Sequence, residues 1–179
     1  LYVLNCGISD VFTVVQFFQG EQKQQILDEA IAAIEYATAP VGTKYGDMRA
    51  KAGHPAPFGL DYVEIGNESY CPEYYDYYQW MYQELKTRYP DMTFLTCLHV
   101  EEKGLPAEIV DEHYYSTPEF FAENIHRYDS LPRTGPGIFI GECAVTQGQP
   151  GTLRAALGEA MFWMGLEKNQ DICRLACYA

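Results

Sequence analysis

The chain alternates short apolar runs with amphipathic stretches, and this rhythm constrains its fold more than any other feature. Six runs rich in Val, Ile, Leu, Phe or Tyr are predicted strands: Tyr2–Cys6, Tyr62–Ile65, Thr93–Leu98, Ile109–His113, Gly137–Ile140 and Ile172–Cys177. Short, nearly continuous apolar runs are typical of parallel strands that are covered on both faces. Strands that alternate with helical stretches predict repeated βα units around a parallel sheet.

The segments between the strands carry apolar residues at helical spacing. Helices are predicted over Glu21–Thr38, over Pro72–Tyr89, and from Pro118 to about Arg127 with Ser116 or Thr117 as the cap. A last helix is predicted from an apolar stripe made of Leu153, Ala156, Leu157, Ala160, Met161 and Met164. The stretch Ala39–Gly59 is rich in Gly and Pro, and we interpret it as a long, ordered excursion and not as a linker.

Six strands of this type in 179 residues predict an α/β fold that is a partial (β/α)8 barrel. A complete barrel typically needs about 250 residues, and the shortfall fits two βα units. The alternative is a smaller open α/β sheet. The residues at the strand ends favour the barrel, because barrel enzymes carry their chemistry at the carboxyl ends of their strands.

Composition excludes several kinds of partner. The formal net charge of −13 argues against nucleic acid and anionic membranes, whose binding relies on clustered Lys and Arg. No apolar run approaches the length of a membrane span. The six Cys and four His show no zinc-binding spacing, so we expect no metal. A neutral polysaccharide is compatible with the charge, and the 15 Tyr fit either sugar contacts or core packing.

Two of the predicted strands end in the same pattern. Tyr62–Ile65 is followed by Gly66-Asn67-Glu68, and Gly137–Ile140 by Gly141-Glu142. A carboxylate buried beside apolar strands is costly unless it is paired or used, and glycoside hydrolysis uses two carboxyl groups that flank the scissile bond. We therefore interpret the two glutamates as an acid/base pair. The alternatives are an acid at a helix N-terminus for Glu68 and a loop acid near Arg154 for Glu142.

These residues belong to a wider set that resembles the α-L-arabinofuranosidases of glycoside hydrolase family 51. The resemblance rests on residues 53–58 (GHPAPF), 62–68 (YVEIGNE), 111–115 (DEHYY) and 141–146 (GECAVT), and it extends over nearly all of the chain. It implies that Glu68 is the acid/base at the end of the fourth barrel strand. It also implies that Glu142 is the nucleophile at the end of the seventh.

Three further residues take roles from the same resemblance. Asn67 would bind the sugar 2-hydroxyl, and Tyr115, less readily Tyr114, would orient the nucleophile. His113 would line the substrate site. Strand alternation places His113 and Tyr115 on one face, which favours Tyr115. The alternative for His113 and both Tyr residues is packing inside the barrel. Cys71 and Cys143, beside the two motifs, depart from the family pattern.

In the family's register the chain covers about strands 3 to 8. Residues 1–179 would then form a partial catalytic barrel, with the first two βα units and the accessory β-sandwich absent. The resemblance implies retaining, exo-acting hydrolysis of terminal α-L-arabinofuranosyl groups from arabinan- or arabinoxylan-type hemicellulose. It implies no cofactor, and arabinose-containing polysaccharides and oligosaccharides as partners.

Two alternatives to this function stay open at the level of sequence. One is a related retaining barrel glycosidase, a β-xylosidase or an endoglucanase, and the other is an inactive, truncated carbohydrate-binding piece. The family includes cytoplasmic and secreted members, and we favour an extracellular or periplasmic location. For the complete protein we include a homo-oligomer among the expectations.

Overall fold

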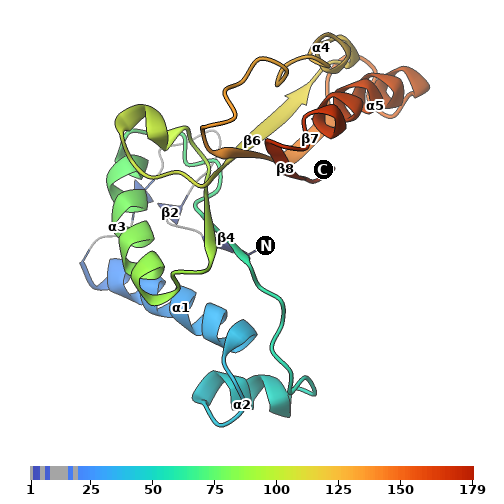
Figure 1. The fold of residues 1–179 in the computed structure, drawn as a ribbon. Coiled ribbons are helices and arrows are strands. Elements are labelled where there is room, and N and C mark those ends of the chain that lie inside the picture. The colour runs from blue at the N-terminus through green and yellow to red at the C-terminus, as the bar shows by residue number, and fades with distance from the viewer. Residues whose placement is uncertain (1, 5–6, 9–15, 18–19) are drawn as a thin grey trace. The chain divides into compact units, whose positions relative to one another are not determined.

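The fold consists of two compact units, an amino-terminal unit of residues 1–107 and a carboxyl-terminal unit of residues 108–179 (Figure 1). A computed structural model describes residues 2–4, 7–8, 16–17 and 20–179. The end of the predicted strand Tyr2–Cys6 lies outside these residues. Among the described residues, no helix combines the length and the apolar character that a bilayer span requires.

The amino-terminal unit is built on a parallel sheet with the strand order β1-β4-β5. These strands are β1 (Tyr2–Leu4), β4 (Tyr62–Ile65) and β5 (Thr93–Thr96). A short antiparallel pair that was not predicted follows β1, made of β2 (Gly7–Ile8) and β3 (Gln16–Phe17). The helices are α1 (Gly20–Thr38), α2 (Lys44–Lys51), α3 (Glu73–Arg88) and a 3-10 helix, η1 (Val100–Lys103).

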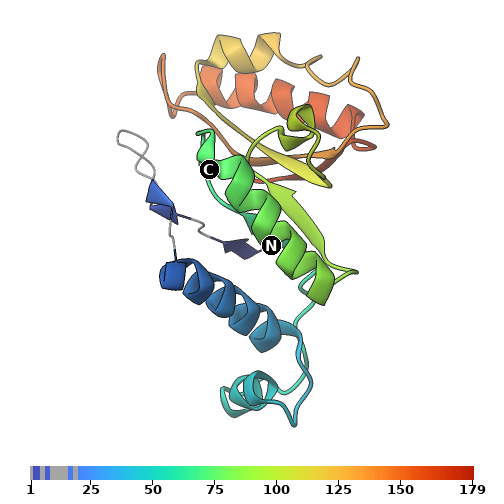
Figure 2. The same ribbon diagram turned by 90° about the vertical axis from the view of Figure 1, so that its left-hand side faces the viewer.

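The carboxyl-terminal unit is built on parallel strands in the order β6-β7-β8. Its elements are β6 (Ile109–Ser116), α4 (Pro118–Glu123), β7 (Gly137–Val145), α5 (Leu153–Lys168) and β8 (Cys173–Ala176). Helices α4 and α5 lie together on one face of this sheet (Figure 2). Strands β6 and β7 run past the predicted ends at His113 and Ile140, so Glu142 lies inside a strand and not after it.

Each unit has its own hydrophobic core. In the amino-terminal unit, α1 and α3 bury residues at helical spacing, among them Leu27, Ile34, Tyr78 and Met81, and the sheet contributes Phe94 of β5. In the carboxyl-terminal unit, the core between the helices and the sheet includes Phe121, Tyr128, Ile140, Phe162 and Leu166. Strand β4, which precedes Glu68, and strand β7, which carries Glu142, are therefore anchored by separate sets of buried side chains.

The last predicted helix is observed as α5, but the apolar stripe that predicted it is not its buried face. The predicted apolar stripe is exposed: Leu153, Ala156, Leu157, Ala160, Met161 and Met164. The buried face instead contains Gly158 and Gly165, which approach the backbone of the preceding segment. A Cβ at Gly158 would lie 2.5 Å from the Pro118 oxygen, and one at Gly165 would lie 2.1 Å from the Ile125 oxygen. Close helix packing selects these small residues, and they share the inner face with the buried Phe162 and Leu166.

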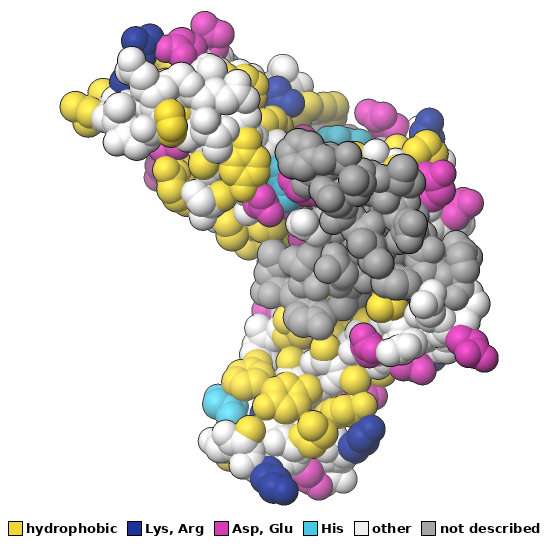
Figure 3. Space-filling view, turned by 180° about the vertical axis from the view of Figure 1, so that it is seen from behind, with side chains coloured by type: hydrophobic (Ala, Val, Ile, Leu, Met, Phe, Trp, Pro, Cys, Tyr) yellow, Lys and Arg dark blue, Asp and Glu magenta, His cyan; other side chains and the backbone are white. Residues whose placement is uncertain are grey.

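The Gly- and Pro-rich stretch Ala39–Gly59 contains a helix, α2, that was not predicted. Its cap is Thr43, whose hydroxyl accepts the Gly46 N–H at 3.2 Å. The fully buried guanidinium of Arg49 donates to three backbone oxygens, those of Tyr36, His54 and Pro55, at 2.8–3.1 Å. These bonds explain why the stretch is ordered, as predicted, and is not a flexible linker. Hydrophobic side chains lie on the surface of this end of the unit (bottom of Figure 3).

Helix α4 is shorter than predicted. It begins as expected, with Thr117 as the cap that accepts the Phe120 N–H at 3.2 Å and with Pro118 in its first turn. It ends at Glu123 and not near Arg127, because Asn124 caps it. The Asn124 amide donates to the Phe120 oxygen at 2.8 Å, the kind of local bond by which Asn competes with continued helix.

Candidate active site

Asn67 and Glu68 lie in the loop that follows β4 in the amino-terminal unit. Glu68 has a φ of +50°, a left-handed conformation that non-glycine residues rarely adopt. The loop is tight, because the Tyr70 N–H donates to the Glu68 oxygen at 2.9 Å. Strained backbone of this kind costs about 1–3 kcal/mol and gathers at functional sites. The strain at Glu68 therefore points to a functional constraint on this loop.

The base of this loop is held by a buried hydroxyl. Tyr74, on the first turn of α3, donates to the Ile65 oxygen at 2.5 Å and accepts the Cys97 N–H at 3.2 Å. The side chain of Tyr74 is completely buried. Tyr74 thus ties the carboxyl ends of β4 and β5 to one helix, and this fixes the point from which the Asn67-Glu68 segment departs.

The competing explanations for both glutamates do not fit. Helix α3 begins at Glu73 with Pro72 as its cap, so Glu68 lies before the helix and not in its first turn. Arg154 pairs with Glu119 and not with Glu142. Neither a helix dipole nor a loop ion pair therefore accounts for these acids.

Glu142, His113 and Tyr115 come together in the carboxyl-terminal unit. The Tyr115 hydroxyl donates to Glu142 Oε2 at 2.6 Å, and His113 Nδ1 lies 3.7 Å from the same oxygen. The His113 side chain is only 6% exposed, whereas that of Glu142 is 35% exposed. The cluster therefore presents a solvent-accessible carboxylate that accepts a hydrogen bond from a phenol and lies beside a buried imidazole.

Tyr114 lies on the opposite face of β6 and does not contact Glu142. Its hydroxyl donates to Glu112, lies 3.1 Å from the Tyr128 hydroxyl, and accepts from Arg127 Nε at 2.8 Å. Burial, followed by the nearby Glu112 charge, raises the pKa of Tyr114 well above that of a free phenol. Tyr114 therefore belongs to a network between the sheet and α4–α5, and Tyr115 is the tyrosine beside Glu142.

Asp111 joins the same cluster, and the sequence analysis did not single it out. Its Oδ2 accepts from His113 Nε2 at 2.9 Å, and its Oδ1 accepts the Gly141 N–H at 2.7 Å. Strand alternation could have found it, because residues 111, 113 and 115 share one face of a strand. It was missed because the search for acids was confined to strand ends.

The two cysteines beside the motifs lie in hydrophobic cores. Cys143 is fully buried among the carboxyl-terminal core residues, and burial raises the pKa of its thiol to about 11. Cys71 packs against the amino-terminal core, and burial raises the pKa of its thiol too. Both thiols are therefore neutral near pH 7 and act as small apolar groups there.

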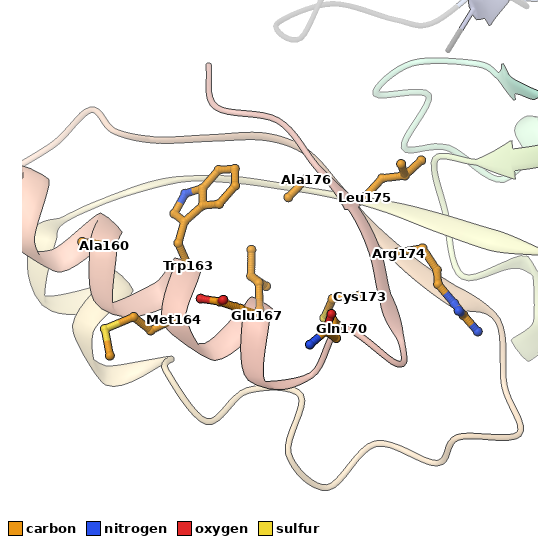
Figure 4. Close-up of a pocket in the computed structure, with 10 residues that line it drawn as sticks. Ala160, Trp163, Met164, Glu167, Gln170, Cys173, Arg174, Leu175 and Ala176 are labelled. Atoms are coloured by element: carbon orange, nitrogen blue, oxygen red, sulfur yellow. The ribbon is translucent and has the colours of Figure 1, made fainter. Parts of the chain in front are cut away.

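A separate hollow lies between α5 and β8 (Figure 4). Its lining is mainly apolar and includes Trp163, Met164 and Leu166 of α5 together with Cys173 and Leu175 of β8. Residues of the two glutamate motifs do not line it. The hollow therefore takes no part in the arrangement around Glu142.

Comparison with protein families and curated proteins shows what the chain is similar to. A family model, the alpha-L-arabinofuranosidase 1 domain, matches residues 1–133. An extracellular exo-alpha-L-arabinofuranosidase of Streptomyces chartreusis is 37% identical over an alignment of length 166 that covers 86% of this chain and 20% of that protein. Alpha-L-arabinofuranosidase 2 of Arabidopsis thaliana is 38% identical over an alignment of length 184 that covers 100% of this chain and 27% of that protein. The chain thus spans about a fifth to a quarter of these relatives.

Solved structures show the same relationship. The arabinose-bound MgGH51 α-L-arabinofuranosidase superposes with a TM-score of 0.86 and 28% identity, over 99% of this chain and 31% of that one. The arabinose complex of the Thermotoga maritima α-L-arabinofuranosidase shares the fold, with a TM-score of 0.67 and 21% identity, over 86% of this chain and 40% of that one. These likenesses confirm the prediction of an α/β fold that forms part of a (β/α)8 barrel.

Proposed function

Because this chain belongs to the α-L-arabinofuranosidases of glycoside hydrolase family 51, we propose that the protein carrying it is a retaining, exo-acting α-L-arabinofuranosidase. Its substrates are terminal α-L-arabinofuranosyl groups of arabinan, arabinoxylan and their oligosaccharides. The observation that carries the proposal is the Glu142 carboxylate held by Tyr115 at 2.6 Å beside His113. A carboxylate fixed in position yet open to solvent is what a glycosidase nucleophile requires.

Glu142 attacks the anomeric carbon in the first step. Oε2 carries the hydrogen bond from Tyr115, so we assign the attack to Oε1. The attack forms a covalent arabinosyl-enzyme and breaks the bond to the leaving-group oxygen. No metal or organic cofactor enters this scheme, because the two carboxyl groups supply both the nucleophile and the proton transfers.

Glu68 acts as the acid and then as the base. It donates a proton to the departing oxygen, then removes a proton from the water that hydrolyses the intermediate, and this gives net retention. Asn67, its neighbour in the loop, binds the 2-hydroxyl of the sugar. The left-handed backbone at Glu68 supports this assignment, since it fixes the direction in which the carboxyl group leaves the loop.

The substrate class follows from charge and from relatives. A chain with a net charge of −13 suits a neutral polymer better than a polyanion. The name of the Streptomyces chartreusis relative states an exo-acting and extracellular enzyme, and we extend both properties to this protein. Within the proposal, residues 1–179 supply strands 3 to 8 of the barrel.

The test uses the complete polypeptide that contains these residues. We expect hydrolysis of an aryl α-L-arabinofuranoside, with the α anomer as the first product seen by NMR. Glu142→Ala should abolish turnover of every substrate. Glu68→Ala should lose most activity on substrates with poor leaving groups, because an activated aryl group departs without protonation, and added azide should restore turnover. Glu29→Ala, an exposed acid on α1, is the matched control.

Two outcomes would contradict the proposal. Preference for an aryl β-D-xyloside would move the protein to another retaining glycosidase activity. Equal loss in both glutamate variants on all substrates, without azide rescue, would refute the assigned roles. A structure of the complete enzyme adds a geometric test, because retention requires Glu68 and Glu142 carboxyl groups about 5–5.5 Å apart, whereas about 6.5–9.5 Å indicates inversion.

A further inference from the structure

A β-bulge turns Glu142 toward His113 and Tyr115. Along β6 and β7, Glu112 pairs with Ile140, but His113 pairs with Glu142, so Gly141 is an extra residue in β7. If the register continued without the bulge, Gly141 would pair with His113, and Glu142 would pair with Tyr114 and share the face that packs against the helices. A shift of one residue reverses the face of every side chain that follows it. The orientation of Glu142 therefore depends on the bulge at Gly141.

One carboxylate oxygen of Asp111 binds this bulge, and the other binds His113. The Gly141 N–H, which the bulge takes out of the strand ladder, donates to Oδ1 at 2.7 Å, and His113 Nε2 donates to Oδ2 at 2.9 Å. The Asp111 side chain is only 2% exposed. A Cβ at Gly141 would lie 2.4–2.5 Å from the two carboxylate oxygens. The Asp111 carboxylate thus occupies the space that a side chain at position 141 would need.

We propose that Asp111 is a positioning residue for the nucleophile, acting through the Gly141 bulge and through His113. The proposal rests on the function proposed for Glu142. A carboxylate only accepts hydrogen bonds, so Asp111 fixes the His113 proton on Nε2 and directs Nδ1 toward Glu142 Oε2. The same side chain satisfies the backbone donor next to the nucleophile. Asp111 therefore sets both the strand geometry that carries Glu142 and the tautomer of its neighbour.

An amide cannot replace this carboxylate, although it has the same shape. Two donors face residue 111, and each needs an acceptor oxygen, whereas Asn offers one oxygen and one NH2 group. If the oxygen faces Gly141, the NH2 group meets His113 Nε2 and forces its proton onto Nδ1. If the oxygen faces His113, the NH2 group opposes the Gly141 N–H and opens the bulge. Asp111→Asn therefore either reverses the hydrogen bond to His113 and changes its tautomer, or breaks the link to Gly141.

The experiment compares Asp111→Asn with Glu112→Gln in the complete polypeptide. Glu112 is the adjacent acid on β6, and it accepts from Tyr114 and Tyr128 on the helix-facing side. We expect Asp111→Asn to lower kcat on an aryl arabinofuranoside about 10- to 100-fold, the size of loss that a displacement of about 1 Å produces, with little change in KM. Glu112→Gln should lower Tm and leave kcat near wild type.

A second readout is independent of turnover. Imidazole 15N NMR, with the His113 signal assigned by its loss in His113→Gln, should show a protonated Nε2 in the wild type. In Asp111→Asn the proton should move to Nδ1, or the signal should show an exchanging ring. Gly141→Ala displaces the same carboxylate without removing it, so it should reproduce the kcat loss. The double variant should be no worse than the poorer single variant, because both changes act through one contact.

The two proposals fail in different ways. A wild-type protein without arabinofuranosidase activity would refute the proposed function, and the NMR signal would still test the contact between Asp111 and His113. An active wild type with unchanged kcat in folded Asp111→Asn, or with an equal loss in Glu112→Gln, would overturn the role of Asp111. If Asp111→Asn does not fold, Gly141→Ala and the wild-type tautomer decide the question.

Discussion

Replacing Tyr115 by Phe removes one hydroxyl from the Glu142 cluster and leaves the ring in place. The bond it deletes is 2.6 Å long and ends on a carboxylate oxygen. A hydrogen bond to a charged group contributes about 1.5–3 kcal/mol, but Tyr115 is 41% exposed and water competes for the same oxygen. We therefore expect the barrier to attack to rise by about 1–2 kcal/mol, which corresponds to about a 5- to 30-fold fall in kcat.

The sign of this effect depends on which role of the hydroxyl dominates. The bond stabilises the ground-state carboxylate, so its loss alone would make Glu142 more nucleophilic. It also holds Oε2 in place, so its loss lets the carboxylate rotate away from the anomeric carbon. Orientation of reacting groups accounts for a large part of many rate enhancements, and we expect positioning to dominate. KM should change little, because the hydroxyl contacts the enzyme's own carboxylate.

The assay is steady-state hydrolysis of an aryl arabinofuranoside by the complete polypeptide, with Tm measured for each variant. Tyr114→Phe is the matched control, since it removes a hydroxyl from the next residue but on the opposite face, where it contacts Glu112, Tyr128 and Arg127. It should lower Tm and spare kcat. Wild-type kcat in Tyr115→Phe, or equal losses in the two variants, would refute the reasoning.

Three further predictions concern the units themselves. Gly165→Ala should lower Tm despite a helix-propensity gain of about 1 kcal/mol, because the new Cβ would lie 2.1 Å from a backbone oxygen, whereas Gly59→Ala, with nothing within 4 Å, should be neutral. Exposed Cys177 should react with a thiol reagent at pH 8, while buried Cys143, whose thiol pKa is about 11, reacts only on unfolding. Hydrogen bonds from Asn169 and Lys168 lower the pKa of Asp129. The stability that they contribute is present above the usual pKa range of Asp and is lost as the pH falls below it. On acidification, Asp129→Asn should therefore lose less folding stability than the wild type.

Strand positions and strand faces could be predicted from the sequence because both follow local patterns. The run Tyr62–Ile65 is observed with the predicted bounds. Alternation along β6 singled out Tyr115 over Tyr114, and Tyr115 is the one that contacts Glu142. Helix α2 was less visible, because its order depends on Arg49 reaching backbone oxygens as far away as Tyr36. A single cation that satisfies distant carbonyls leaves no periodic signature.

The inner face of α5 could not be predicted because an exposed apolar stripe competes with the buried one, which includes Phe162 and Leu166 as well as two glycines. Hydrophobic periodicity identifies a buried face when burial is limited by the transfer of large apolar groups from water. Where a helix lies close to another backbone, the space for side chains decides which residues face inward, and Gly158 and Gly165 fit because they have no Cβ. The sequence contains both the exposed apolar stripe and the stripe with Gly158 and Gly165, and only the positions of the neighbouring carbonyl groups decide which one faces inward.

Asp111 escaped detection for a related reason. When one segment is considered alone, an acid inside a predicted strand is unfavourable, since a buried carboxylate needs partners. Its partners here are the imidazole two residues away and a backbone N–H thirty positions further along the chain. That N–H is available only because Gly141 bulges out of the β6–β7 ladder. A bulge is a property of two strands in register, so it cannot be read from either strand alone. The Gly-Glu pattern at residues 141 and 142 therefore has a structural basis as well. The missing side chain of Gly141 leaves space for the Asp111 carboxylate, which binds the bulge that determines the face on which Glu142 lies.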